Sequence, residues 1–176
     1  AGVELLAKGT DDEKGWDEVM LVDMGGATTD VHSYAEQDSL EGVRIVGAPE
    51  PKAKRTVEGD IGARESVNSL IEAADIRRLQ RISGLSEIEI AACRDNRLAH
   101  HDFVPDTEKE KRFEQAIAME AVRVSVRRHA GQIYDGYAEG VQRIQKGKDL
   151  LNVKTIIGTG GPIIDSENPS LILKQA

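Results

Sequence analysis

VMLVDMGGATTDV, the stretch at residues 19–31, begins as a short apolar run and continues into an acid, a glycine pair, two threonines and a second acid. The apolar run predicts a buried strand. The glycine pair allows a backbone turn to approach a ligand closely and to present its N–H groups. Thr28 and Thr29 add hydroxyl donors, and Asp23 at the strand end can hold a hydrated Mg²⁺. The stretch therefore predicts a phosphate-binding loop between two strands.

A simple hairpin turn is the alternative interpretation of Gly25 and Gly26, because a glycine pair between apolar runs is a common turn signal. An ordinary turn does not require two hydroxyls and two carboxylates around it. The surrounding residues therefore favour the phosphate-binding interpretation.

Composition excludes several classes of protein. At 176 residues we expect a single domain over 1–176, and its net charge of −8 argues against nonspecific binding to nucleic acid or to a membrane surface. A single cysteine, Cys93, excludes an internal disulfide framework and favours a reducing, cytoplasmic location. No apolar run is long enough to span a bilayer. The chain begins with Ala1 rather than Met, and we expect it to be a segment of a longer protein.

The remaining patterns alternate between strands and helices. We expect strands near 28–35 and 40–46, and a capping box at Ser86 and Glu89 predicts a helix through about residue 97. The acids that follow Pro105 open the longest helix, which ends before Gly131. Residues 132–145 fit either a helix or a hairpin that turns near residues 139–140. A helical insertion over 75–130 is expected to pack at the edge of the domain or to form a small subdomain.

A second glycine loop lies near the end of the chain. Residues 153–157 predict a buried strand, and it runs into Gly158-Thr159-Gly160-Gly161-Pro162. A strand followed by a glycine loop and a helix is typical of nucleotide sites in α/β proteins. The fold class is therefore α/β, with a mixed sheet flanked by helices.

The two glycine loops resemble motifs of the actin-like ATPase superfamily. Residues 23–30 are similar to its second phosphate motif, and residues 158–162 are similar to its adenosine motif. Their order along the chain matches the C-terminal, ribonuclease-H-like half of that two-domain fold. The resemblance implies ATP and Mg²⁺ as cofactors. It also implies an N-terminal half as a partner, because no first phosphate motif is found; Asp60 is not assigned to one, since no apolar strand is expected before it.

Within the superfamily the chain resembles the MutL family associated with adenosylcobalamin-dependent glutamate mutase, which is distinct from the mismatch-repair protein of that name. The similarity is carried by VDMGGATTDVHS at 22–33, RTVEGDIGAR at 55–64 and GKDLLNVKTIIGTGGPII at 147–164. It implies an ATP-dependent, chaperone-like reactivating factor whose partners are subunits of a glutamate or ornithine mutase. Two alternatives stay open: an ATP-dependent subunit of the hydantoinase or oxoprolinase type, and a nucleotide-gated interaction module without turnover.

The resemblance also implies a role for each matching residue. Asp23 would orient Mg²⁺ through water, and Asp30 would position the attacking water or pin the loop. The phosphates would bind backbone N–H groups and two hydroxyls, contributed by Gly25, Gly26, Ala27, Thr28 and Thr29. The adenine and ribose would pass over Gly158, Thr159, Gly160 and Gly161. The junction at Glu58 and Asp60 would lie near the ribose, although Asp60 is equally suited to cap a helix.

Overall fold

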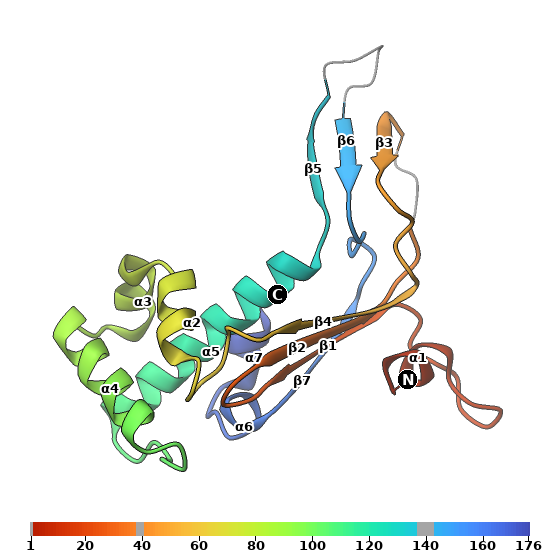
Figure 1. Ribbon diagram of the computed structural model, residues 1–176. Helices are drawn as coiled ribbons and strands as arrows, with labels where there is room; N and C mark the ends of the chain where they lie inside the picture. Colours follow the sequence, from red (N-terminus) through yellow and green to blue (C-terminus); the bar gives the residue numbers. More distant parts are fainter. Residues whose placement is uncertain (1, 38–40, 137–142) are drawn as a thin grey trace.

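The computed structural model describes residues 2–37, 41–136 and 143–176. Its centre is a four-stranded mixed sheet in the order β4-β2-β1-β7 (Figure 1). The strands are β1 (Val19–Met24), β2 (Thr29–Tyr34), β4 (Ala53–Glu58) and β7 (Thr155–Thr159). β2 is antiparallel to both of its neighbours, whereas β7 is parallel to β1. The α/β class with a mixed sheet, expected from the sequence, is confirmed.

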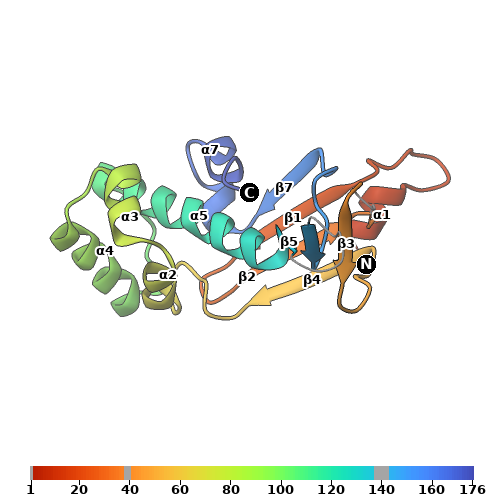
Figure 2. The same ribbon diagram turned by 90° about the horizontal axis from the view of Figure 1, so that it is seen from above.

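The longest helix, α5 (Glu108–His129), covers one face of the sheet (Figure 2). Side chains alternate between the faces of a strand, and Met20, Val22 and Met24 of β1 are the ones buried in the main core with α5. The helices α2 (Val67–Ala73), α6 (Gly161–Ile164) and α7 (Pro169–Leu173) also pack against α5. On the opposite face, α1 (Gly2–Lys8) is the only helix within the described residues, and it covers Val19 in a smaller cluster. The part of that face near Asp23 is therefore exposed.

The helices expected to begin after Pro105 and after Ser86 are confirmed as α5 and α4 (Glu87–Ala99). The Thr107 hydroxyl caps α5 by accepting a hydrogen bond from the backbone of Glu110. The capping box of α4 forms in full, with Ser86 and Glu89 each accepting from the other's backbone N–H. Satisfying these N–H groups fixes where each helix begins.

Helix α3 (Ile76–Ser83) lies with α2 and α4 along one side of α5 (Figure 1). Only this α3–α4 part of the range 75–130 is peripheral to the sheet. The rest of the range is α5, whose core residues contact β1 and β2. The long helix therefore belongs to the body of the domain, because its apolar residues supply the layer that covers the sheet.

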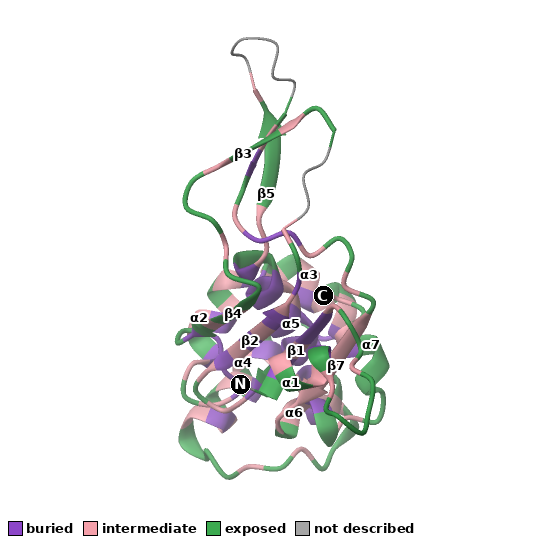
Figure 3. Ribbon diagram, turned by 90° about the vertical axis from the view of Figure 1, so that its right-hand side faces the viewer, coloured by how far each residue is buried: buried purple, intermediate pink, exposed green. Residues whose placement is uncertain are grey.

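A second, three-stranded sheet projects from the body as an arm (Figures 1 and 3). It consists of β3 (Val43–Val46), β6 (Arg143–Lys146) and β5 (Gln132–Asp135), in the order β3-β6-β5. The strand expected at 40–46 is thus found at 43–46, but it belongs to the arm. The hairpin interpretation of 132–145 is the one that agrees with the antiparallel pair β5–β6. The expected turn near residues 139–140 lies outside the described residues.

A strand does precede Asp60, although it is not the apolar strand of a first phosphate motif. β4 occupies residues 53–58 and pairs with β2 along its whole length. Its sequence, AKRTVE, lacks an apolar run because β4 is the edge of the sheet and most of its side chains are exposed.

Among the described helices, none has the length and apolarity required to cross a membrane.

Candidate functional site

The two glycine loops predicted from the sequence lie next to each other. β1 and β7 are adjacent and parallel, so the two loops follow the carboxyl ends of neighbouring strands and lie at the same end of the sheet. Asp23 is paired to Thr159 there. Gly160 follows with a positive φ of 89°, and a Cβ at this position would collide with the carbonyl of Met24. Only glycine fits such a close approach of two backbones. The structure therefore joins two motifs separated by more than a hundred residues.

The first loop is held in shape by backbone hydrogen bonds. The N–H of Gly25 donates to the Thr28 carbonyl at 2.8 Å, which closes the loop. The carbonyl of Gly25 accepts from Ala63 at 3.0 Å, and that of Gly26 accepts from Arg64 at 2.7 Å. The segment after β4 thus supports the loop from one side and occupies its carbonyl groups.

Asp23 and Asp30 occupy directly opposed positions on β1 and β2. Opposed residues of an antiparallel pair project from the same face, so both carboxylates lie on the face away from α5. The Asp30 carboxylate accepts a 2.8 Å hydrogen bond from Arg55 Nε, whereas Asp23 is exposed. Asp30 is therefore already engaged in a contact that fixes the strand, which fits the loop-pinning role.

The two threonines of the loop differ in accessibility. Thr29 is fully buried, and its hydroxyl donates to the Ile61 carbonyl at 2.9 Å. That bond ties β2 to the segment after β4 and leaves the hydroxyl turned away from solvent. Thr28 is only half-buried. Of the two threonines expected to bind phosphate, only Thr28 is therefore partly exposed.

Glu58 and Asp60 are not brought to the second glycine loop. β4 and β7 are the two outer strands of the sheet, so two strands separate Glu58 from residues 158–161. Arg128 binds the carboxylates of Glu58 at 2.7 Å and Asp60 at 2.8 Å. The hydrogen bond from Arg128 lowers the pKa of Asp60 below its usual value. Their observed contact is with Arg128 at the end of α5, and neither lies beside residues 158–161.

The glycines of the second loop serve different purposes. A Cβ on Gly158 would press against the side chains of Ile163 and Leu173, so this glycine permits helix packing. A Cβ on Gly161 would lie 3.5 Å from Asp165, an ordinary contact. Gly161 and Pro162 border a cavity of about 340 Å³ between α6 and the N-terminal half of α5. Its volume is within the range of small-molecule sites, about 300–1,000 Å³.

This cavity has a mixed polar and apolar wall. Its basic side chains are Arg64, Lys111 and Arg112, and Lys111 pairs across it with Glu167 at 2.7 Å. Val104 and Pro105 supply apolar surface. A planar base with a polar edge could be held between such groups. The cavity continues directly from the glycine loops, because Gly161 follows Gly160.

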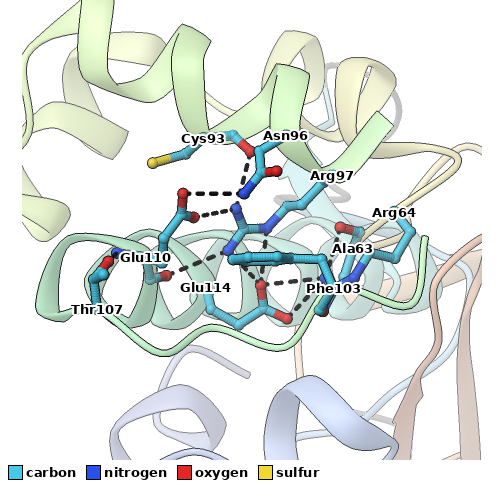
Figure 4. Close-up of polar contacts among 9 residues, drawn as sticks. All are labelled: Ala63, Arg64, Cys93, Asn96, Arg97, Phe103, Thr107, Glu110 and Glu114. Atoms are coloured by element: carbon cyan, nitrogen blue, oxygen red, sulfur yellow. Dashed lines mark hydrogen bonds and ion pairs between the residues drawn. The ribbon is translucent and has the colours of Figure 1, made fainter. Parts of the chain in front are cut away.

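A buried arginine that the sequence analysis did not single out stabilises this wall (Figure 4). Arg97 of α4 is fully buried and pairs with Glu110 at 2.6 Å and Glu114 at 2.8 Å, both on α5. Glu114 also binds Arg64 at 2.9 Å. A chain of ion pairs therefore connects α4 to the residue whose N–H holds Gly26. No sequence signal reveals it, because the partners lie on different helices.

His129 is another buried polar residue that the sequence analysis did not use. Its Nε2 lies 2.8 Å from Ser33 Oγ and its Nδ1 lies 2.6 Å from Thr56 Oγ1. Burial lowers the pKa of His129 to about 4, so the ring is neutral at pH 7. It links the end of α5 to β2 and β4 and is closed to solvent.

These features define an α/β domain with a mixed sheet in which two glycine loops meet at one edge beside a cavity. The chain belongs to the MutL protein family, whose sequence profile matches residues 1–176. It is 48% identical over 172 residues to a Protein MutL of Clostridium tetanomorphum, an alignment that covers 97% of this chain and 37% of that relative. The chain thus spans little more than a third of the relative's length. No solved structure matches it.

Proposed function

We propose that this chain is the ATP-binding part of a chaperone-like reactivating factor for an adenosylcobalamin-dependent mutase, built as the ribonuclease-H-like C-terminal half of an actin-like ATPase. The observation that carries the nucleotide-binding part is the pairing of Asp23 with Thr159. It sets the predicted phosphate loop and the predicted adenosine loop side by side. The mutase part of the proposal rests on membership of the MutL family.

The residues at this edge fit a nucleotide with a bound Mg²⁺. Mg²⁺ usually takes one or two carboxylates and completes its shell with water and phosphate oxygens. The described residues contain no cluster of three or more ligating side chains, and Asp23 is the exposed carboxylate at the loop. An arrangement with one carboxylate agrees with a metal that arrives together with a phosphate chain.

In this proposal the phosphates lie over the first loop, where backbone N–H groups and the Thr28 hydroxyl donate to them. The nucleoside lies across Gly160 and Gly161, with the base in the 340 Å³ cavity. Asp30 keeps β2 in place through Arg55. Bound ATP supplies a phosphoanhydride bond whose hydrolysis can drive a conformational change.

Phosphoryl transfer depends on electrostatic contacts from several sides of the phosphate chain. The loops described above contribute one side only. We therefore expect this chain by itself to bind ATP weakly and to hydrolyse it negligibly. The other side would come from an N-terminal ATPase half.

Gly161 allows a direct test of the site. In the full-length protein, Gly161→Val places a side chain at the border of the cavity without a backbone clash. We expect a loss of at least about tenfold in affinity for a fluorescent ATP analogue, equal to about 1.4 kcal/mol. Gly59→Val is the matched control, since its Cβ would meet open space. Unchanged binding by Gly161→Val would show that the base does not occupy this cavity.

Three outcomes separate the classes of function. A reactivating factor releases ADP faster when inactivated mutase is added and requires no small-molecule substrate. A hydantoinase- or oxoprolinase-type subunit releases ADP only with a cyclic amide. A nucleotide-gated module binds ATP without either response. The last two results would contradict the proposal.

A further inference from the structure

A second cavity, larger than the first and on another part of the molecule, lies where the arm meets the body. Its volume is about 610 Å³, and it is bordered by the C-terminal end of α5, by β5 and by the end of β6. Its basic side chains are Lys54, Arg123, Arg127, Arg128 and Lys146. Among the described residues that line it, none is acidic. This concentration of positive charge stands out in a chain whose net charge is −8.

Three of these cations are fixed by carboxylates outside the cavity wall. Lys54 pairs with Glu50 at 3.0 Å, Arg123 with the buried Glu120 at 2.6 Å, and Arg128 with Glu58 and Asp60. Such pairs hold the cationic groups in position and offset part of their charge. Among the described residues, Arg127 and Lys146 form no ion pair and are exposed. Two cations that line the cavity, one on α5 and one on β6, are thus left to attract an anionic group.

The arm is held firmly enough to serve as a wall. Gly131 and Gly147 cross in close contact at its base, and the N–H of Gly131 donates to the Lys148 carbonyl at 2.7 Å. The Lys148 side chain is buried, and its ammonium group donates to the carbonyls of Ala35 and Pro51. These bonds fix β5 and β6 relative to the end of α5.

β5 determines how an extended ligand segment could lie along the cavity. It is an outer strand of the arm and, within the described residues, has a strand neighbour on one side only. All four of its residues are exposed. Gln132 and Tyr134 project from the same face of β5, because side chains alternate along a strand. Both border the cavity, as does Lys146, which is paired with Gln132. An extended segment added beside β5 would therefore point every second side chain at the cations.

We infer that the groove between β5 and the end of α5 binds an extended acidic segment of a partner protein, with carboxylates at alternate positions. A small anion would bind through the cationic side chains alone. An added strand also uses the free edge of β5 and covers the exposed side chains of Tyr134 and Ile133. Arg127 and Lys146 are the residues that contact the partner carboxylates, and Tyr134 packs against the partner chain. This site is independent of the nucleotide site proposed above.

The test compares two fluorescein-labelled peptides of equal composition, Glu-Thr-Glu-Thr-Glu-Thr and Glu-Glu-Glu-Thr-Thr-Thr, by fluorescence anisotropy at low salt. We expect the alternating peptide to bind at least about tenfold more tightly. Equal affinities would overturn the inference, because they indicate charge attraction without strand pairing. Binding of pyrophosphate in place of either peptide would overturn it too, since the site would then accept a small phosphate.

Reversing the charges of Arg127 and Lys146 tests whether the peptide binds in the proposed groove. The double variant Arg127→Glu/Lys146→Glu is expected to lose at least about tenfold in affinity for the alternating peptide. Lys14→Glu/Arg81→Glu reverses two exposed cations away from the groove and is the matched control. If the first variant is poorly folded by circular dichroism, Arg127→Gln/Lys146→Gln removes the charges without introducing repulsion. Equal losses in the control and in the groove variant would contradict the proposed location.

Discussion

Asp23 of β1 lies directly opposite Asp30 of β2, and both carboxylates project from the face of the sheet that α5 does not cover. Arg55 engages Asp30 at 2.8 Å, and Asp23 is exposed beside the glycine loop. The pair thus divides into one carboxylate that fixes the strand and one that is accessible to a cation.

The first prediction concerns Asp23→Asn in the full-length protein. We expect Mg²⁺-dependent ATP hydrolysis to fall by at least about 100-fold, because the carboxylate that is proposed to position the metal loses its charge. The free energy of unfolding should stay nearly constant, since the side chain is exposed. Steady-state phosphate release measures the activity. Asp12→Asn, an exposed acid in a loop, is the control, and a loop that serves only as a turn would leave both variants fully active.

The second prediction concerns the close approach of Gly160 to Met24. Gly160→Ala should destabilise the domain by about 1–3 kcal/mol, because the residue has a positive φ and its Cβ meets backbone. Urea unfolding followed by circular dichroism measures the change. Gly59→Ala, where the new methyl group meets open space, should change stability by less than about 1 kcal/mol. Similar values for the two variants would show that the loops do not touch.

The third prediction concerns the buried ion pairs of Arg97. Arg97→Met leaves Glu110 and Glu114 without their buried cation, and removing one partner of such a pair costs about 3–5 kcal/mol. Arg94→Met removes an exposed pair with Asp95 on the same helix and should cost less than about 1 kcal/mol. The free energies of unfolding of the two variants give the comparison. A loss for Arg97→Met no larger than that for Arg94→Met argues against the buried arrangement.

The fourth prediction concerns the pH dependence of stability. Burial lowers the pKa of His129 from 6.5 to about 4, so the unfolded chain binds a proton at a higher pH than the folded chain. This contribution to stability is fully present above pH 6.5 and is lost as the pH falls toward 4. The loss amounts to about 3 kcal/mol. His129→Gln should remove this part of the pH dependence, whereas His101→Gln, at an exposed site, should keep it.

The sequence predicts best those elements whose signals are local. The glycine loops follow apolar runs, and α4 and α5 begin at capping residues, so each could be located from a few neighbouring residues. β4 escapes prediction because an edge strand with charged, exposed side chains lacks the apolar run expected of a buried strand. The arm stays ambiguous for a related reason: its four-residue strands are largely exposed on both faces.

In the candidate site, too, the residues with local sequence signals could be predicted and those set by distant contacts could not. Asp23, Gly160 and Gly161 could be named from the motifs, and the structure brings them together at one edge. The contacts of Thr29 with Ile61 and of Arg128 with Glu58 could not, because they join segments distant in the sequence. Such contacts depend on how the helices pack over the sheet. A sequence pattern therefore located the loops, but not which of their side chains are free to bind.

The side chains of the arm follow a different constraint from those of the body. Within the described residues, no side chain of β3, β5 or β6 belongs to either hydrophobic cluster. Substitutions at the exposed positions of these strands should therefore leave both hydrophobic clusters intact, whereas Gln145 of β6 is buried. The arm is in this sense a modular part: its outward-facing residues can be exchanged to change what the protein recognises, while the sheet beneath and its loops stay as they are.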